Sequence, residues 1–280
     1  MKQIQQFRLK NPYFFLATGV LLIALFMSWL IGSEFLNVML ATEEDVKKSM
    51  TCNSKKEYLD MILPIVLTWE NSWLSVFLYI TEIFPIFPSI VALGFIRELK
   101  GYFSLASHRF HKPKKSVRKA CFWYAVQGGL AVTIALLIFN TILAPFVEVT
   151  FVDMGGIDDF FFPQYFYPLH PYCMFNVLAC TIYFLVGFTF SLLAICIAMW
   201  KQNILWILAT PFVVYKLENM LSAELGGFRP LRVGDSVLAF QSSANLLVVS
   251  IPLWILIGVS ICLIEWRLCT KKSWVCESSL

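Results

Sequence analysis

Six long apolar runs constrain the fold of this chain more than any other feature of its sequence. A helix needs about 20 consecutive apolar residues to cross the hydrocarbon core of a bilayer, and each run reaches roughly that length. With 59% hydrophobic and only 14% charged residues, the chain is also too apolar for an ordinary soluble domain. We predict an all-α integral membrane protein, with one membrane domain over residues 1–280 and six transmembrane helices. The predicted spans are Tyr13–Gly32, Trp73–Ile96, Cys121–Val147, Met174–Trp200, Ile204–Leu225 and Leu246–Trp266.

The distribution of charge sets the orientation of these spans. Lysine and arginine gather before Tyr13, in the loop 97–119, at Lys201 and after Trp266, whereas acids predominate in the other connections. Basic residues are retained on the cytoplasmic side of a bilayer, so this pattern predicts cytoplasmic N- and C-termini. The outer loops are then residues 33–72, 148–173 and 226–245. The net charge of +4 does not indicate nucleic-acid binding, because it follows from topology and no base-stacking motif accompanies it.

The cytoplasmic loop 97–119 contains the pattern of a short amphipathic helix. Its apolar residues recur at i, i+3, i+4 and i+7, and its polar residues take the other face. The apolar positions are Leu99, Tyr102, Phe103 and Ala106, and the polar positions are Lys100, Ser104 and Ser107. A membrane protein that presents such a helix to the cytosol offers a surface to a soluble partner.

The outer connections differ in character. Residues 57–63 predict a helical stretch on the membrane surface before Pro64. The loop 148–173 is rich in aromatic residues, which fits either an interfacial belt or the lip of a ligand site. Glycine and proline in 226–245 predict a broken or re-entrant element before the last span. The short connection Lys201–Asn203 makes the fourth and fifth spans antiparallel neighbours.

Polar residues inside the apolar runs are the candidates for a substrate pathway. Glu82 follows Thr81 in the second run, where Pro85 and Pro88 should kink the helix and free backbone carbonyls. A charge in hydrocarbon is costly, so Glu82 either faces a pathway or forms an interhelical hydrogen bond, unless it lies near the outer interface. Asn140 is a further pathway candidate, with helix–helix hydrogen bonding as the alternative. Lys216 and Glu218 in the fifth run are expected to pair with neighbouring groups or to snorkel.

Motifs for catalysis and metal binding are missing from the sequence. It has no GxxxxGK[ST], no GxGxxG after a strand, no HExxH and no CxxC, so we expect neither ATP hydrolysis by this chain alone nor a metal site. Of the eight cysteines, Cys52 and Cys173 are both predicted outside, where a disulfide is permitted. Two unrelated free thiols are the alternative.

The inner loop and the layout of the spans resemble the coupling region of a known family. Arg97–Glu98, then Gly101, then Ser107–His108–Arg109, then Lys119 at the third span resemble permease subunits of type-2 ABC exporters, especially those of Gram-positive bacteria. The six-span layout and the broken element before the last span are similar as well. Tyr102 departs from the small hydroxyl residue that often follows the glycine in that family.

This resemblance implies a function through partners. The chain would be the transmembrane subunit of an exporter in the bacterial plasma membrane, joined by a second permease copy or a homologous permease and by two cytosolic ATPase subunits that bind ATP and Mg²⁺. Its substrate would be amphipathic, such as an antimicrobial peptide, a drug or a lipid. The residues expected to couple to the ATPase are Arg97, Glu98, Leu99, Lys100, Gly101, Tyr102, Phe103 and Arg109. Two alternatives stay open: a non-transporting membrane module for bacteriocin immunity or peptide sensing, and a membrane-embedded enzyme that uses Glu82.

Overall fold

The computed structural model describes residues 11–43, 46, 54–103, 113–147, 170–225, 232–241 and 246–270. The described part is all-helical and has no strands. In chain order its elements are α2 (Pro12–Gly32), α3 (Phe35–Leu40), α5 (Lys55–Val66), α6 (Trp69–Ile80), α7 (Ile86–Ser89), α8 (Ala92–Glu98), η1 (Leu99–Phe103), α10 (Pro113–Leu143), α13 (Pro171–Leu178), η2 (Ala179–Tyr183), α14 (Phe184–Trp200), α15 (Ile204–Glu224), α16 (Val233–Val237), η4 (Ala239–Gln241) and α17 (Leu246–Thr270). The elements η1 and η2 are π-helical, and η4 is a 3₁₀ turn.

Five stretches of helix are long and apolar enough to cross a membrane. They are Pro12–Gly32, Lys114–Leu143, Pro171–Trp200, Ile204–Glu224 and Leu246–Thr270. Five of the six predicted runs are therefore confirmed as apolar helices of spanning length, although several bounds differ, and the largest difference has a clear cause. The third helix begins at Pro113 and not at Cys121, because lysine and arginine are good helix formers and continue the helix into the basic loop.

The second predicted run, Trp73–Ile96, is not a single helix. It is divided into α6, α7 and α8, with turns at residues 81–85 and 90–91. Pro85 and Pro88 lack the N–H that a continuous helix would need. The seryl hydroxyl of Ser191 in α14 donates to the Pro88 carbonyl at 2.6 Å, so a carbonyl at the break is bonded from a neighbouring helix. The kink predicted from these prolines is confirmed, and the α-helix gives way there to turns with i→i+3 backbone hydrogen bonds, such as that from the Ile83 N–H to the Ile80 carbonyl.

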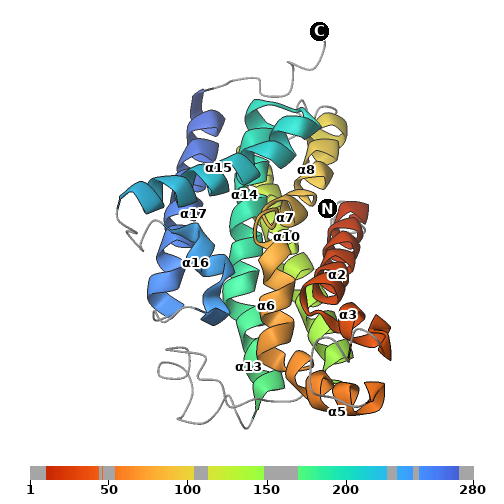
Figure 1. Cartoon of the computed structure of the whole chain (residues 1–280). Coiled ribbons are helices and arrows are strands. Elements are labelled where there is room, and N and C mark those ends of the chain that lie inside the picture. The colour runs from red at the N-terminus through yellow and green to blue at the C-terminus, as the bar shows by residue number, and fades with distance from the viewer. Residues whose placement is uncertain are drawn as a thin grey trace.

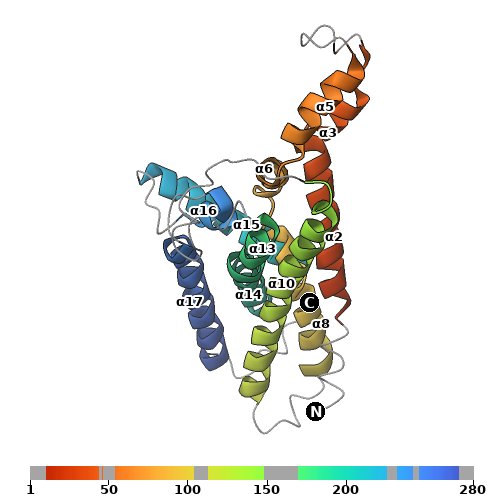
Figure 2. The same ribbon diagram turned by 90° about the horizontal axis from the view of Figure 1, so that it is seen from below.

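Close contact of small residues fixes the centre of the bundle, where α10 crosses α14. A Cβ on Gly128 would lie 1.7 Å from the Ser191 oxygen, and a Cβ on Gly187 would lie 2.8 Å from the Gly128 carbonyl. Only glycine permits this approach of the two backbones. Along the bundle, α14 and α10 lie centrally, with α17 on one side and α2 on the other (Figure 2). A small residue also lies at the α2–α6 contact, where the Ser28 hydroxyl donates to the Val76 carbonyl at 2.6 Å.

The two ends of the bundle are distinct in Figure 1. The end of α8 and the C-terminal end of α17 lie at the top, and α5 lies at the bottom. The helix predicted in the first outer loop is confirmed as α5, although it continues through Pro64 to Val66. The buried side chains form two clusters, one around Trp73 and Phe77 and one around Phe95 and Tyr124 near α8.

The helix α15 differs from the other spans in its orientation and burial. It crosses α14 obliquely in Figure 1, and only 17% of its most apolar window is buried within the chain. The short elements α16 and η4 follow, and Val233, Val237 and Phe240 are buried in the larger cluster. The described part of the predicted broken element is thus a pair of short helical turns packed into the bundle.

Candidate functional site at the broken second span

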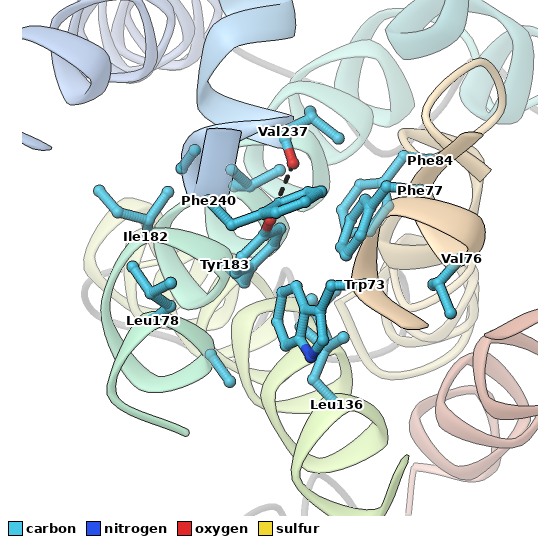
Figure 3. Close-up of a cluster of buried hydrophobic side chains, with 14 of the residues drawn as sticks. Trp73, Val76, Phe77, Phe84, Leu136, Leu178, Ile182, Tyr183, Val237 and Phe240 are labelled. Carbon is cyan, nitrogen blue, oxygen red and sulfur yellow. Dashed lines mark hydrogen bonds between the residues drawn. The ribbon is translucent and has the colours of Figure 1, made fainter. Parts of the chain in front are cut away.

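Aromatic side chains from α6, from the turn after it, from η2 and from η4 form one buried cluster (Figure 3). The ring of Trp73 lies 5.4 Å from that of Phe77, and Phe77 lies 5.1 Å from Tyr183 and 5.3 Å from Phe240. The Tyr183 hydroxyl donates to the Val237 carbonyl at 2.9 Å. These rings bring together α6, the π-helical η2 and the short elements α16 and η4.

Asn140 joins three helices from within this region. Its side chain is fully buried, accepts from Trp73 Nε1 at 3.1 Å and donates to Asn176 Oδ1 at 2.9 Å. Both polar ends of the side chain are therefore bonded to protein groups on α6 and α13. This geometry is that of a helix-joining hydrogen bond, and a pathway role for Asn140 stays a prediction.

Thr81 and Glu82 lie in the turn between α6 and α7. The Thr81 hydroxyl donates to the Phe77 carbonyl at 2.5 Å, within its own helix end. Glu82 forms an ion pair with Lys216 of α15, and the two side chains remain 63% and 34% exposed. The pairing expected for Lys216 is confirmed, and its partner comes from the broken span. The neighbouring Glu218 keeps one buried carboxylate oxygen without a hydrogen bond in the described residues.

Glu70 is a carboxylate that sequence reasoning missed. It lies in the first turn of α6, where only 9% of it is exposed, and neither of its oxygens has a hydrogen-bond partner in the part of the chain that the structure describes. A buried polar group without a hydrogen-bond partner is costly, which makes Glu70 a candidate functional residue. The signal in the sequence was its spacing, since Trp73 and Phe77 follow at i+3 and i+7 and both are buried.

The segment η1, predicted to lie inside and to couple to a partner, continues α8 without a gap. Arg97, Lys100 and Gly101 are exposed, whereas Glu98 and Leu99 are buried. Leu99 belongs to the same buried cluster as Phe95, Val117 and Leu268. The expectation that Leu99 offers its apolar side chain to a partner is therefore wrong, because the chain's own core already covers it.

Charged and aromatic residues tie the helix ends together at the level of α8. The Arg118 guanidinium makes a two-pronged ion pair with Glu265, with Nε donating at 2.6 Å. Arg267 donates to the Met199 carbonyl at 3.2 Å and stacks over the Trp200 ring. A cation at the last carbonyls of α14 is favoured by the helix dipole. The ends of α10, α14 and α17 are held in one arrangement.

Several predicted site residues lie outside the described residues. These are Arg109, Cys52, and the side chains of Tyr102 and Phe103, together with the aromatic stretch of the second outer loop. Cys173 is exposed at the start of α13, and its bridge to Cys52 stays a prediction. Among the described residues, no three His, Cys, Asp or Glu side chains are grouped so that they could hold a metal ion.

Comparison of the chain with protein-family models, with curated proteins and with solved structures finds no match in any of the three. In the described residues, the chain's own geometry comprises an interrupted run of helices, α6 to α8, that ends in the exposed basic residues Arg97 and Lys100.

Proposed function

We propose that this chain is the transmembrane subunit of an ATP-driven ABC exporter in a bacterial plasma membrane. In this proposal α6, α7 and α8 together form the second of six spans, and the termini and the 97–119 loop are cytoplasmic. Two cytosolic subunits bind ATP and Mg²⁺ and hydrolyse the nucleotide, and a second permease completes the transmembrane part. The substrate is an amphipathic molecule such as an antimicrobial peptide, a drug or a lipid.

The observation that carries the proposal is the continuity of the broken span with the basic inner element. Helix α8 passes directly into η1, which places Arg97 and Lys100 on the surface while Leu99 remains in the core. A force applied to the exposed basic side chains would reach the packed interior through Leu99 and Phe95. The interruption at residues 81–85 then allows α8 to move relative to α6.

In this proposal the substrate moves outward. Closure of the partner ATPases on bound ATP pushes on Arg97–Arg109, and α8 transmits the displacement to the middle of the bundle. There the aromatic contacts between α6, η2 and η4 must rearrange for a substrate to pass outward. The chain itself contributes binding surfaces and moving helices, and the chemistry belongs to the ATPase subunits.

Charge reversal of the exposed inner residues tests the proposal. The variant Arg97→Glu/Lys100→Glu should insert normally but lose most of the ATPase that co-purifies with the native chain from its own organism, because complementary charges at an interface are replaced by repulsive ones. Lys201→Glu is the matched control, since Lys201 is an exposed basic residue at the α14–α15 turn. Leu99→Asp is unsuitable here because it would place a charge in the core.

Two outcomes would reject the exporter. If no ATPase accompanies the native chain, or if it accompanies the doubly reversed variant at full yield, then this element is not the coupling site. Peptide binding to the intact chain without any ATPase would instead support the immunity or sensing role.

A further inference from the structure

The ion pair between Glu82 and Lys216 lies in an unusual position for a membrane protein. It joins the turn after α6 to α15, part-way along the bundle, between α5 at one end and the tip of α8 at the other (Figure 1). Glu82 is nevertheless more than half exposed on the surface of the chain. Lipid hydrocarbon cannot solvate such a pair, and charged groups at this depth face protein or water.

The surroundings of the pair are apolar and equally uncovered. Leu74 and Leu78 are exposed on α6 at a spacing of four, Glu82 follows in the turn after that helix, and Leu217 and Met220 are exposed on α15. Helix α15 is the least buried of the five apolar helices. An incompletely covered ion pair thus lies among exposed apolar side chains, and polar groups within a membrane hold neighbouring helices together.

We infer that this face of α6 and α15 is where a second copy of the same chain docks, with Glu82 of each copy pairing with Lys216 of the other. The argument is one of symmetry. Because the two charges touch, they lie at the same depth in the membrane. Two copies with the same orientation are related by a twofold axis along the membrane normal, and such an axis beside the pair brings each charge opposite its complement. The two pairs within the two chains are exchanged for two pairs between them.

This inference rests on the part of the proposed function that joins two permease copies, and it does not depend on the ATPase. It names the surface, the occupant and the two residues that set the register. Charge complementarity favours a second copy over an unrelated membrane protein, since the patch carries one charge of each sign and is therefore complementary to itself.

A charge-exchange experiment in lipid nanodiscs separates pairing between chains from pairing within a chain. Two differently tagged chains are co-expressed, and the yield of one captured through the other is measured. With Glu82→Lys in both chains, or Lys216→Glu in both, capture should fall several-fold. With Glu82→Lys in one chain and Lys216→Glu in the other, capture should return to the native yield, because one copy supplies two basic side chains and its partner two acidic ones.

The exposed pair of Arg118 and Glu265 provides a matched control. It is also a contact between two helices of one chain, and opposite charge reversals there, in the same mixed design, should leave capture unchanged. If the mixed chains at Glu82 and Lys216 are captured no better than either variant alone, the pairing between chains is rejected.

A second measurement avoids variants that disturb the charges. The photo-crosslinking amino acid benzoylphenylalanine is placed at Leu78 or, as a control, at Ile23 of α2, whose exposure is closely similar at 65% against 61%. Irradiation of native membranes should give a covalent dimer from Leu78 and little from Ile23. Equal yields from both positions would overturn the docking face. Loss of the dimer with the ATPase retained would reject this inference alone, whereas a dimer without any ATPase would reject the exporter alone.

Discussion

Asn140 illustrates how single polar residues hold an apolar bundle in register. Water is absent from the hydrocarbon core, so a buried amide must find its partners within the protein. Asn140 does so on two other helices, through Trp73 and Asn176. Glu70 is the opposite case, since its buried carboxylate lacks any such partner in the described residues. The first residue therefore has a structural explanation, and the second is the stronger candidate for a functional group.

Replacing Asn140 should reveal the strength of this three-helix contact. Asn140→Leu leaves the Trp73 indole N–H and the Asn176 amide oxygen without their partner, and an unsatisfied buried group costs about 1–3 kcal/mol. We expect a clear fall in the thermal unfolding midpoint in detergent. Thr181→Val is the control, because Thr181 is exposed and its hydroxyl donates to the Val177 carbonyl of its own helix. Equal midpoints for the two variants would show that the contact adds nothing to stability.

At the scale of the elements, the crossing of α10 and α14 is the most sterically demanding contact described. Gly128→Ala places a methyl group on the Ser191 hydroxyl, which must then give up its bond to the Pro88 carbonyl. Overpacking of this kind costs about 1–3 kcal/mol. The variant should therefore unfold at a lower temperature and should also loosen the broken span.

Gly19→Ala in α2 is the matched control for that crossing. Nothing lies within 4 Å of a Cβ at Gly19, and alanine is favoured over glycine in a helix interior by about 1 kcal/mol. This variant should be neutral or slightly stabilised in the same unfolding assay. Destabilisation by both substitutions would mean that the α10–α14 crossing has no special role.

The sequence predicted five of the apolar helices but not the contacts between them. Apolar length placed the starts of Ile204–Glu224 and Leu246–Thr270 correctly, because hydropathy is a local property. It misplaced the start of α10, since basic residues end an apolar run without ending a helix. The Glu82–Lys216 pair and the burial of Leu99 depend on residues distant in sequence, and no periodicity within one segment reveals which distant helix will cover it.

For the whole molecule, the arrangement of helix ends makes the predicted orientation testable. Ser54 caps α5 at one end of the bundle, and Ser116 lies in the first turns of α10. The two test variants are Ser54→Cys and Ser116→Cys. In intact cells a membrane-impermeant thiol reagent should label the first and not the second, with the native chain as background, because basic residues flank Ser116 and are retained inside. Labelling of Ser116→Cys from outside would reverse the topology and remove the basis for a cytoplasmic coupling element.

The π-helical turn η2 has a consequence for how this chain tolerates insertions and deletions. A π turn holds one residue more than a regular turn, and each residue of an α-helix advances the helix by about 100°. Deleting Cys180 would let Pro171–Trp200 run as a uniform α-helix, but Asn176 and Gly187 could then no longer both face α10. The extra residue sets the rotation of α13 relative to α14 about their common axis. At this point the number of residues is therefore constrained more strictly than their identity.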